Sequence, residues 1–555
     1  MNIRKIILII ILSGIISTIL GQTTAVGTEK KNFRMSGSIQ AGSFFYGSNG
    51  PGIRQQPFGY SLGAQLNISL YGLSIPFYAS LNEQGTAFQH PFNRYGLSPK
   101  YKWATAHIGW RSMAMSEFTL NNTTFLGGGL ELKPGKFRFS FMMGNLKQPE
   151  NLAALDVLSP QFKRKGLAFK IGKGTEENHF DFIVFKAKDD TNSVSLPDSV
   201  MRTLNAHENL VLGIKNKTTM LKKKMVLDID AAASIFSSDI RFDPIQLSAD
   251  GKYDWVKKIY NPNISTSATY AIQGKIGYQQ KSWGLGVQYR RVMPDFKTLG
   301  SEYLLSDLEA ITVNPSLNLM KGQLMISGSY GTQRNNLDMK RLGTNERQIS
   351  SFGITYNPKP SYGFYAGYSN YTFQQQIVID SLYNDSIVIN QLTHNIIFTP
   401  RLTLIKENWV SNLILTINYQ LLADQNEVTA DMQNNDMILA NLIYSAVAKK
   451  TGLTINSGIN YFRFHQQAIN ISRFGFNVGA SQKFFKKKLN LGLNTSYSLQ
   501  DETFGNSNFF SVNLRLGYQI HKKTQLSVIG LLNNVNTTNT KYSEQRIQIQ
   551  IVQGF

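Results

Sequence analysis

Apolar and small polar residues alternate along this chain in runs of about ten residues. From Phe510 to His521 every second residue is apolar, and the residues between them are Ser, Asn, Arg, Gly, Gln and His. The same alternation covers residues 412–421 and 489–500, and it recurs around 324–330, 363–373 and 474–484. A period of two residues predicts β-strands whose two faces meet different surroundings.

The polar face of these strands carries mostly Gly, Ser, Asn, Gln and Thr, with occasional Arg. A soluble β-sandwich would instead expose a charged face to water, so the composition favours a barrel interior on this side and lipid on the other. Charged residues make up only 17% of the chain and aromatic residues 12%, and no linker-like stretch interrupts residues 33–555. We therefore predict an all-β fold, a single transmembrane antiparallel β-barrel over 33–555. The alternative is a series of soluble sandwich or propeller domains.

Short basic turns alternate with longer mixed loops. The turns are predicted at 134–136, 174–178, 222–224, 281–282, 321–322, 358–360, 406–408, 449–450, 486–488 and 522–523, and the loops at 145–163, 188–206, 237–263, 294–310, 374–390 and 422–437. Outer-membrane barrels have short periplasmic turns and long extracellular loops. The spacing predicts about 24 strands, within 22 to 26, and an even number is expected. The direct count is 25, because residues 82–124 leave open whether Tyr101–Met113 is one strand, part of an inward loop or half of a missed hairpin.

The N-terminus predicts export. Arg4 and Lys5 precede an apolar stretch, Ile6–Leu20, that is shorter than the roughly 20 residues of a membrane-spanning helix. We predict a signal peptide at 1–21, with cleavage after Gly21 or alternatively after Gly27, and a short segment at 22–32 before the first strand. The chain has no cysteine, which excludes a lipidated N-terminal cysteine, a disulfide framework and thiol chemistry.

The chain ends inside a predicted strand. Ile547, Ile549, Ile551 and Phe555 share one face, opposite Arg546, Gln548, Gln550, Val552 and Gly554. A last strand ending in Phe resembles the assembly signal that the barrel-insertion machinery of bacterial outer membranes reads. Gln553 departs from that pattern, in which an apolar or aromatic residue is commoner. The predicted location is therefore the bacterial outer membrane.

A barrel of this size should enclose a wide lumen, because barrel diameter grows roughly linearly with strand number. An open hole of that width would breach the permeability barrier, so inward loops or a partner protein should fill it. About ten residues separate the signal peptide from the strand at Phe33, too few for a separate plug domain. The candidate inward loops are 82–100, 188–206 and 237–263. An ordinary solvated surface loop is the alternative for each of them.

The net charge of +22 invites a nucleic-acid reading, which we reject because the lysines are scattered through turns and export removes that partner. Two other uses fit the charge. Basic turns can meet anionic outer-membrane lipid, and Arg290, Arg473 and Arg515 on lumen faces would favour the passage of anions. The alternative is local pairing with Asp and Glu.

Catalytic and metal-binding signatures are missing from the sequence, so we expect neither an enzyme nor a cofactor. None of the seven histidines has a metal-binding spacing, and there is no Gly-x-Ser-x-Gly elbow. His107 is expected in the lumen or an interface rather than as a base. Asp189-Asp190 is expected to begin a turn, with a calcium site as the less favoured reading.

Three stretches resemble large, poorly characterised outer-membrane proteins of the Bacteroidota. They are Tyr95-Gly96-Leu97-Ser98-Pro99 through Trp103, then Thr124-Phe125-Leu126-Gly127-Gly128-Gly129, and Pro134-Gly135-Lys136-Phe137-Arg138-Phe139, and the similarity extends through Phe185–Asp190 and Glu208-Asn209-Leu210. The resemblance implies a barrel, and a phylum in which several large barrels belong to secretion or surface-assembly complexes. It transfers no functional residue.

Two functional hypotheses follow. The first is a loop-gated channel or transport pore for solutes or polymers, which predicts an anion-favouring conductance. The second is a structural subunit of an outer-membrane secretion or assembly complex whose lumen is filled by a protein partner. The second predicts copurifying proteins and no open channel.

Overall fold

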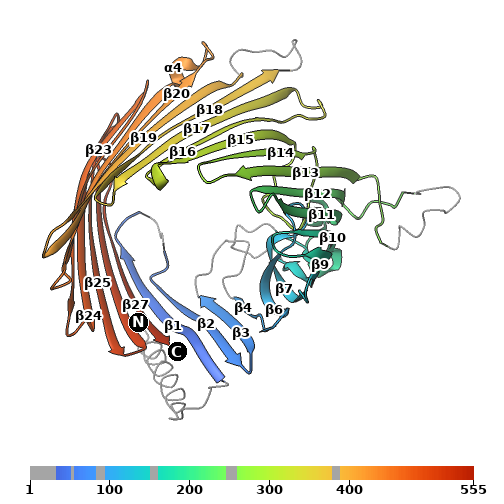
Figure 1. Cartoon of the computed structure of the whole chain (residues 1–555), viewed down its shortest axis with the longest axis horizontal. Coiled ribbons are helices and arrows are strands. Elements are labelled where there is room, and N and C mark those ends of the chain that lie inside the picture. Colours follow the sequence, from blue (N-terminus) through green and yellow to red (C-terminus); the bar gives the residue numbers. More distant parts are fainter. Residues whose placement is uncertain (1–32, 52–54, 83–93, 151–159, 246–258, 378–387) are drawn as a thin grey trace. The chain divides into compact units, whose positions relative to one another are not determined.

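A computed structural model describes residues 33–51, 55–82, 94–150, 160–245, 259–377 and 388–555 (Figure 1). The predicted signal peptide at 1–21 and the segment at 22–32 lie outside these residues. The described part of the chain is almost entirely strand. Its strands are β1 (Phe33–Ser48), β2 (Phe58–Leu70), β3 (Leu73–Asn82), β4 (Arg94–Leu97), β5 (Lys100–Tyr101), β6 (Ala104–Ala114), β7 (Asn121–Leu132), β8 (Phe137–Lys147), β9 (Lys163–Gly174), β10 (His179–Asp190), β11 (Glu208–Met220), β12 (Met225–Ser237), β13 (Thr266–Gln279), β14 (Trp283–Val292), β15 (Leu308–Leu319), β16 (Leu324–Arg334), β17 (Gly343–Lys359), β18 (Tyr362–Ile377), β19 (Asn390–Ile405), β20 (Trp409–Asp424), β21 (Asn435–Ala448), β22 (Thr454–Gln466), β23 (Ile469–Phe484), β24 (Leu489–Glu502), β25 (Gly505–His521), β26 (Thr524–Thr537) and β27 (Lys541–Gly554).

Helical structure in the described residues is confined to short segments in the connections. They are the 3-10 turns η1 (Thr191–Ser193) and η2 (Met320–Gly322) and the helices α2 (Asp198–Thr203) and α4 (Ala430–Gln433). Within the part of the chain that is described, no helix has the length and apolar character needed to cross a membrane.

The chain divides into two compact units. Unit 1 comprises Met1–Lys102, Pro400–Ile417 and Met437–Phe555, and unit 2 comprises Trp103–Thr399 and Asn418–Asp436. In unit 1, β1 pairs with β2 on one side and with β27 on the other, where Ser38–Ser48 run antiparallel to Glu544–Gly554. In unit 2, successive strands from β6 to β18 pair as antiparallel neighbours wherever their register is described, as in β12 with β13.

The strands belong to one sheet whose first strand pairs with its last, and this is the topology of a closed antiparallel β-barrel. β4 and β5 both pair with β3 and share one position, so the 27 described strands occupy 26 positions. The predicted fold class is confirmed, with a strand number at the upper end of the predicted range. The difficulty at residues 82–124 is also explained. Residues 104–114 form one strand, β6, and the position missing from the sequence count is filled by the very short β4 and β5.

Each predicted short turn joins two antiparallel strands. The turn at 134–136 joins β7 to β8, and the turn at 522–523 joins β25 to β26. Connections of an antiparallel sheet alternate between its two edges, so within each unit the basic turns share one edge, which we call the short-turn edge. The longer connections, such as 148–162 and 293–307, share the other, the long-loop edge.

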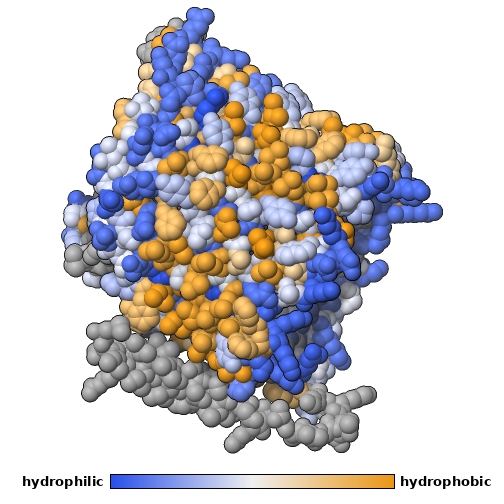
Figure 2. Space-filling view, turned by 90° about the vertical axis from the view of Figure 1, so that its left-hand side faces the viewer, coloured by the Kyte–Doolittle hydropathy of each residue, from blue (hydrophilic) through white to orange (hydrophobic). Residues whose placement is uncertain are grey.

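Large apolar side chains are exposed on one face of the strands. In β23, Phe474, Phe476 and Val478 are each about half exposed, and Leu514 in β25 is similar. Figure 2 shows apolar side chains gathered in a broad band on one face of the molecule, bordered by hydrophilic residues. An apolar band between polar borders is what a lipid bilayer requires of a barrel's outer surface. We call this the outer face and the opposite side of each strand the inner face.

Candidate functional site on the inner face

In unit 2, the inner face of β8 to β13 is covered by packed side chains. Successive strands contribute buried apolar groups, among them Met142 from β8, Ala168 from β9, Phe185 from β10 and Val211 from β11. Two connections complete the cluster, Met115–Leu120 between β6 and β7 and Met293–Asp307 between β14 and β15. Their Phe118, Leu120 and Phe296 are fully buried. We call these two connections the inner loop pair.

Asp230 on the inner face of β12 anchors the first loop. Its Oδ1 accepts the Ser116 hydroxyl at 2.6 Å, and its Oδ2 accepts the backbone N–H of Glu117 at 3.1 Å. Ser116 Oγ in turn accepts the backbone N–H of Phe118 at 3.1 Å. A single buried carboxylate therefore satisfies groups of a tight loop that would otherwise lack partners away from water.

Arg290 of β14 holds the next residue of the same loop. Its Nη1 forms an ion pair with the Glu117 carboxylate and donates to Gln273 Oε1 at 3.0 Å. Its guanidinium carbon lies 5.3 Å from the centre of the Phe118 ring, close enough for a cation–π contact. Sequence analysis proposed Arg290 as an anion-facing residue. The structure places it on the inner face, where its charge is engaged by Glu117.

Asn209 of β11 fixes the second loop. It is fully buried, and its amide donates to the Lys297 carbonyl at 3.2 Å and to Ser234 Oγ at 2.9 Å, while its oxygen accepts the Leu299 N–H at 3.0 Å. The two loops also bind each other, since the Thr298 hydroxyl donates to the Thr119 carbonyl at 2.6 Å. The inner loop pair is therefore one hydrogen-bonded layer on the sheet.

Buried ion pairs continue the inner face below and beside this layer. Arg138 of β8 binds both carboxylate oxygens of Asp181 at 2.8 and 3.0 Å, and Arg164 of β9 binds those of Asp189 at 2.7 and 2.9 Å. Asp189 also accepts the backbone N–H of His207 at 2.9 Å. Two parallel hydrogen bonds fix the guanidinium plane and the carboxylate plane relative to each other, so these pairs fix the positions of the strands that carry them.

The inner face of unit 1 is different in kind. Its side chains are small, polar and half exposed, and inner asparagines lie over glycines on the neighbouring strand, as Asn460 does over Gly475 and Asn477 over Gly458. A Cβ on Gly475 would lie 2.5 Å from Asn460 Oδ1, so a larger residue there would require the Asn460 amide to move. The result is a low, polar surface that water can reach.

Arg473 and Arg515 lie on this accessible inner face. Arg473 Nε donates to Gln500 Oε1 at 2.6 Å and its guanidinium lies 4.9 Å from the Phe509 ring centre. Arg515 is exposed, and its Nε donates to Asn513 Oδ1 at 3.2 Å. Both hydrogen bonds go to neutral amides, which leave the positive charge uncompensated, in contrast to Arg290.

The inner loop pair was missed by sequence analysis. The sequence predicted inward loops at 82–100, 188–206 and 237–263. The described end of the first lies in β4 and β5. The described parts of the second and third pack on each other at the long-loop edge, around Val194, Ala206 and Ile240. Residues 83–93 and 246–258 lie outside the described residues. In the described part of 259–265, burial raises the pKa of Tyr260 to about 12, and its hydroxyl donates to the Glu208 carbonyl. The run Met113-Ala114-Met115 before Phe118 was the available signal, because it breaks the alternation of β6.

The remaining sequence expectations concern single residues. His107 faces inward from β6, with Nε2 3.4 Å from the Glu131 carboxylate. Asp190 begins the turn η1, where its carboxylate accepts the Asn192 N–H, and Asp189 is engaged by Arg164. Among the described residues no group of His, Asp and Glu could hold a metal ion.

In β27, Ile547 and Ile549 are exposed on the outer face, and the Phe555 N–H donates to the Gly37 carbonyl at 3.0 Å. Their role as an assembly signal stays a prediction.

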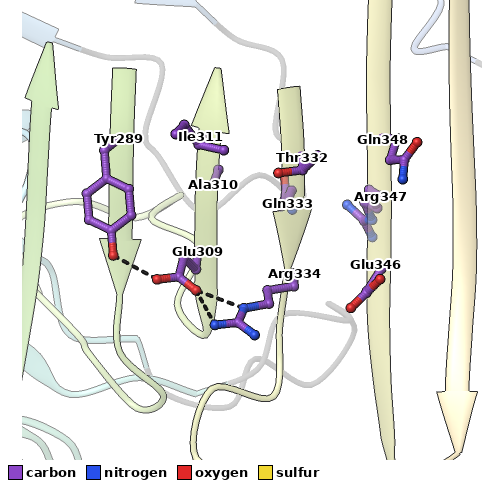
Figure 3. A pocket seen from close by; sticks show the side chains of 10 residues that line it. All are labelled: Tyr289, Glu309, Ala310, Ile311, Thr332, Gln333, Arg334, Glu346, Arg347 and Gln348. Carbon is purple, nitrogen blue, oxygen red and sulfur yellow. Dashed lines mark hydrogen bonds and ion pairs between the residues drawn. The ribbon is translucent and has the colours of Figure 1, made fainter. Parts of the chain in front are cut away.

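A pocket of about 310 Å³ lies where β14 to β17 reach the long-loop edge (Figure 3). Glu309 is at its centre and accepts the Tyr289 hydroxyl at 2.7 Å and Arg334 Nε at 2.8 Å. Glu309 and Tyr289 share the outer face with Ile311. Its lining also includes Gln333 and Arg347, which pair with each other on the opposite side of β16 and β17, and Glu309 is engaged by Arg334 and Arg291.

Comparisons with known proteins add only distant likenesses. No family model matches the chain, and no curated protein matches it. Among solved structures, OccAB2 of Acinetobacter baumannii has 11% identity and a TM-score of 0.29 over 63% of this chain and 92% of that one. OpdK of Pseudomonas aeruginosa, solved with vanillate, has 11% identity and a TM-score of 0.29 over 71% and 98%. The translocation pore of the P pilus usher PapC has 9% identity and a TM-score of 0.26 over 94% and 99%. Nothing about function is carried over from these proteins.

Proposed function

We propose that this protein is an outer-membrane pore through which solutes or polymers pass, with an inner wall that is packed over β8 to β13 of unit 2 and polar and water-accessible in unit 1. The observation that carries the proposal is the contrast between the two inner faces. One is sealed by the inner loop pair, and the other presents half-exposed amides, hydroxyls and the guanidinium groups of Arg473 and Arg515. A wall of this second kind suits an aqueous path.

The location rests on the outer face. Exposed residues such as Phe476 and Leu514 would be costly in water over so wide an area, and a bilayer removes that cost. A signal peptide at 1–21, insertion through the barrel-assembly machinery and an origin in the Bacteroidota belong to the same proposal. We propose no enzymatic activity and no cofactor.

The path should favour anions. Arg473 and Arg515 contact neutral amide oxygens, so their positive charge acts on ions that pass the inner face of unit 1. Arg290 should contribute little, because Glu117 neutralises it. This ranking separates the three arginines that sequence analysis treated as equivalent.

One observation favours the second hypothesis, a barrel filled by a protein partner. The inner face of β16 to β18 exposes apolar and aromatic side chains, including Met325, Ile349 and Tyr371, each about 40% exposed. An apolar partner segment could cover them. The same strip could equally contact the apolar faces of a passing polymer.

Single-channel conductance of the refolded protein in a planar bilayer tests the pore. We expect steady conductance with anion preference, and Arg473→Gln with Arg515→Gln should lower the anion-to-cation permeability ratio by about two- to tenfold while Arg290→Gln leaves it within about twofold. The protein itself must be folded, as judged by resistance to proteolysis. A folded barrel without measurable conductance would overturn the proposal of a pore and favour the partner-filled subunit. The follow-up is then to crosslink from positions 349 and 371 in native membranes and identify the protein that is captured.

A further inference from the structure

The excess positive charge of the chain gathers at the short-turn edge. The lysines are spread through many turns along the chain, and these are the short turns that the sequence predicts on the periplasmic rim. The hairpin topology brings them to the same edge within each unit. The exposed lysines there are Lys133, Lys136, Lys173, Lys222, Lys223, Lys224, Lys281, Lys321 and Lys359 in unit 2, and Lys100, Lys102, Lys406, Lys449, Lys450, Lys483, Lys486, Lys487, Lys488, Lys522 and Lys523 in unit 1. The acidic residues in these turns are Glu176, Glu177 and Glu407.

The long-loop edge shows no such excess. Acidic residues in its described loops, among them Asp239, Asp295, Asp338 and Asp431, accompany the basic ones and pair with several of them, as Asp239 does with Arg241. The charge asymmetry is therefore a property of one edge and not of the whole surface. We call the lysines listed above the lysine collar.

Four turns of the collar hold lysine at positive φ, where lysine is unfavourable: Lys102 and Lys321 singly, at +50° and +56°, and a pair in each of two further turns. Lys222 and Lys223 have φ of +56° and +70°, and Lys486 and Lys487 have +54° and +71°. These two turns match in their hydrogen bond as well, Lys224 N–H to the Leu221 carbonyl at 3.2 Å and Lys488 N–H to the Phe485 carbonyl at 3.1 Å. Each connection has four residues between the paired strand ends, and the preceding Leu221 and Phe485 have positive φ as well, +51° and +50°. Asn and Gly adopt positive φ at less cost than Lys, so the lysine pairs in both units occupy positions for which their backbone is not favoured.

Exposed aromatic side chains stand beside the collar. Phe485 precedes the lysine run of its turn and is 72% exposed, and Trp103 follows Lys102 and is 51% exposed. Trp283 and Tyr362 occupy the same level on β14 and β18. Aromatic side chains next to an apolar band mark the level of lipid headgroups on a barrel. An acidic soluble partner would need the lysines but would gain nothing from aromatics in this position.

We propose that the lysine collar binds the headgroups of anionic phospholipids in the membrane leaflet at the short-turn edge. Lysine ammonium groups supply compact charge and several donors to phosphate oxygens, and the flexible stems let them reach headgroups while the neighbouring rings stay at the interface. The binding fixes the depth and tilt of the barrel in the bilayer. It rests on the proposed function only in placing the barrel in a membrane.

Lipid selectivity of the full chain provides the test. The purified protein is reconstituted with equal amounts of phosphatidylcholine and phosphatidylglycerol, and the lipids that remain bound after gentle re-extraction are measured by mass spectrometry. We expect phosphatidylglycerol to be enriched several-fold in the bound fraction. Replacing Lys222, Lys223, Lys224, Lys486, Lys487 and Lys488 by Gln should reduce the enrichment at least about threefold. Removal of three lysine charges at the long-loop edge, K165Q/K340Q/K541Q, should leave it unchanged, and K486Q/K487Q/K488Q, which removes the same number of charges from the collar, should lower it.

A second variant separates binding from folding. K222N/K223G with K486N/K487G places the preferred residues in the strained turns, so the thermal midpoint should rise while phosphatidylglycerol enrichment falls. Equal enrichment in the turn variants and the long-loop control would overturn the proposal. The proposal would also be overturned if the protein showed no preference among lipids but bound inorganic phosphate or polyglutamate, and if the turn variants lost that binding. Conductance of the same variants keeps the two proposals apart, since a silent barrel with intact lipid enrichment would sink only the pore.

Discussion

Arg290 on β14 and Glu117 in the β6–β7 connection form an ion pair although 173 residues separate them in the chain. The pair joins a strand to a loop that folds onto the inner face, and the Arg290 guanidinium also covers the Phe118 ring. Together with Asp230 of β12, it is therefore a contact through which the sheet holds the first member of the inner loop pair.

Breaking this pair should loosen the loop. Glu117→Gln leaves Arg290 charged and only partly compensated, so we expect a loss of roughly 1 kcal/mol in unfolding free energy after allowing for the exposure of Glu117. Single-channel recordings should show larger current fluctuations and stronger anion preference than wild type. In a double-mutant cycle with Arg290→Gln, a coupling energy near zero would show that the pair holds nothing.

Gly300 should resist enlargement. A Cβ at this position would lie 2.4 Å from the Thr119 carbonyl oxygen, at the point where the two loops meet. We expect Gly300→Val to destabilise the protein by about 1–3 kcal/mol and to expose the loops to protease. Gly277→Val is the control, because a Cβ there meets nothing within 4 Å. Urea unfolding in bicelles gives the comparison, and equal midpoints for both variants would contradict the close approach.

Asn209 should be one of the most sensitive polar residues of the inner face. Asn209→Leu has a similar volume but leaves the buried Leu299 N–H without its acceptor, while the Lys297 carbonyl keeps the Ser234 hydroxyl as its donor. The expected loss is about 1–3 kcal/mol for the group left unsatisfied. Hydrogen exchange should rise at 297–300 and stay unchanged in β22 and β23. Unchanged protection at 297–300 would mean that the loop is held by other contacts.

The connection before β11 should weaken in acid. Burial, followed by the nearby Arg164 charge, lowers the pKa of His207, whose Nδ1 contacts the Ser238 carbonyl at 2.9 Å. The folded state therefore binds a proton less readily than the unfolded chain, whose histidine titrates near 6.5. The stabilising contribution is complete above that value and falls as the pH drops through it. The protection factors of residues 191–207, which correct for the slower intrinsic exchange in acid, should fall between about pH 7 and 5, and His207→Gln should remove this pH dependence. A fall of equal size in the variant would assign the effect to another group.

Much of the fold could be read from the sequence because a barrel strand has a strict period. Residues 510–521 alternate so regularly that β25 and its faces follow directly, and lysine-bearing turns mark the hairpin ends. Strand number was harder. β4 and β5 are too short to show a period, and they are recognisable only through their shared pairing with β3.

The inner site was mostly beyond sequence analysis. Arg290, Arg473 and Arg515 follow the same alternation and look alike along the chain, yet one faces Glu117 and the others face amides. The loop 115–120 is too short to be predicted as an inward loop. It lies on the inner face because Ser116 bonds to Asp230, which is far away in the chain.

The sequence by itself determined the local part of this protein: strands, faces, turns and the apolar surface that meets lipid, since each depends on neighbours one or two residues away. Tertiary structure alone decided which inner charges are neutralised and which loops cover the inner face. Those properties depend on contacts between residues a hundred or more positions apart, and such contacts leave no periodic trace in the sequence.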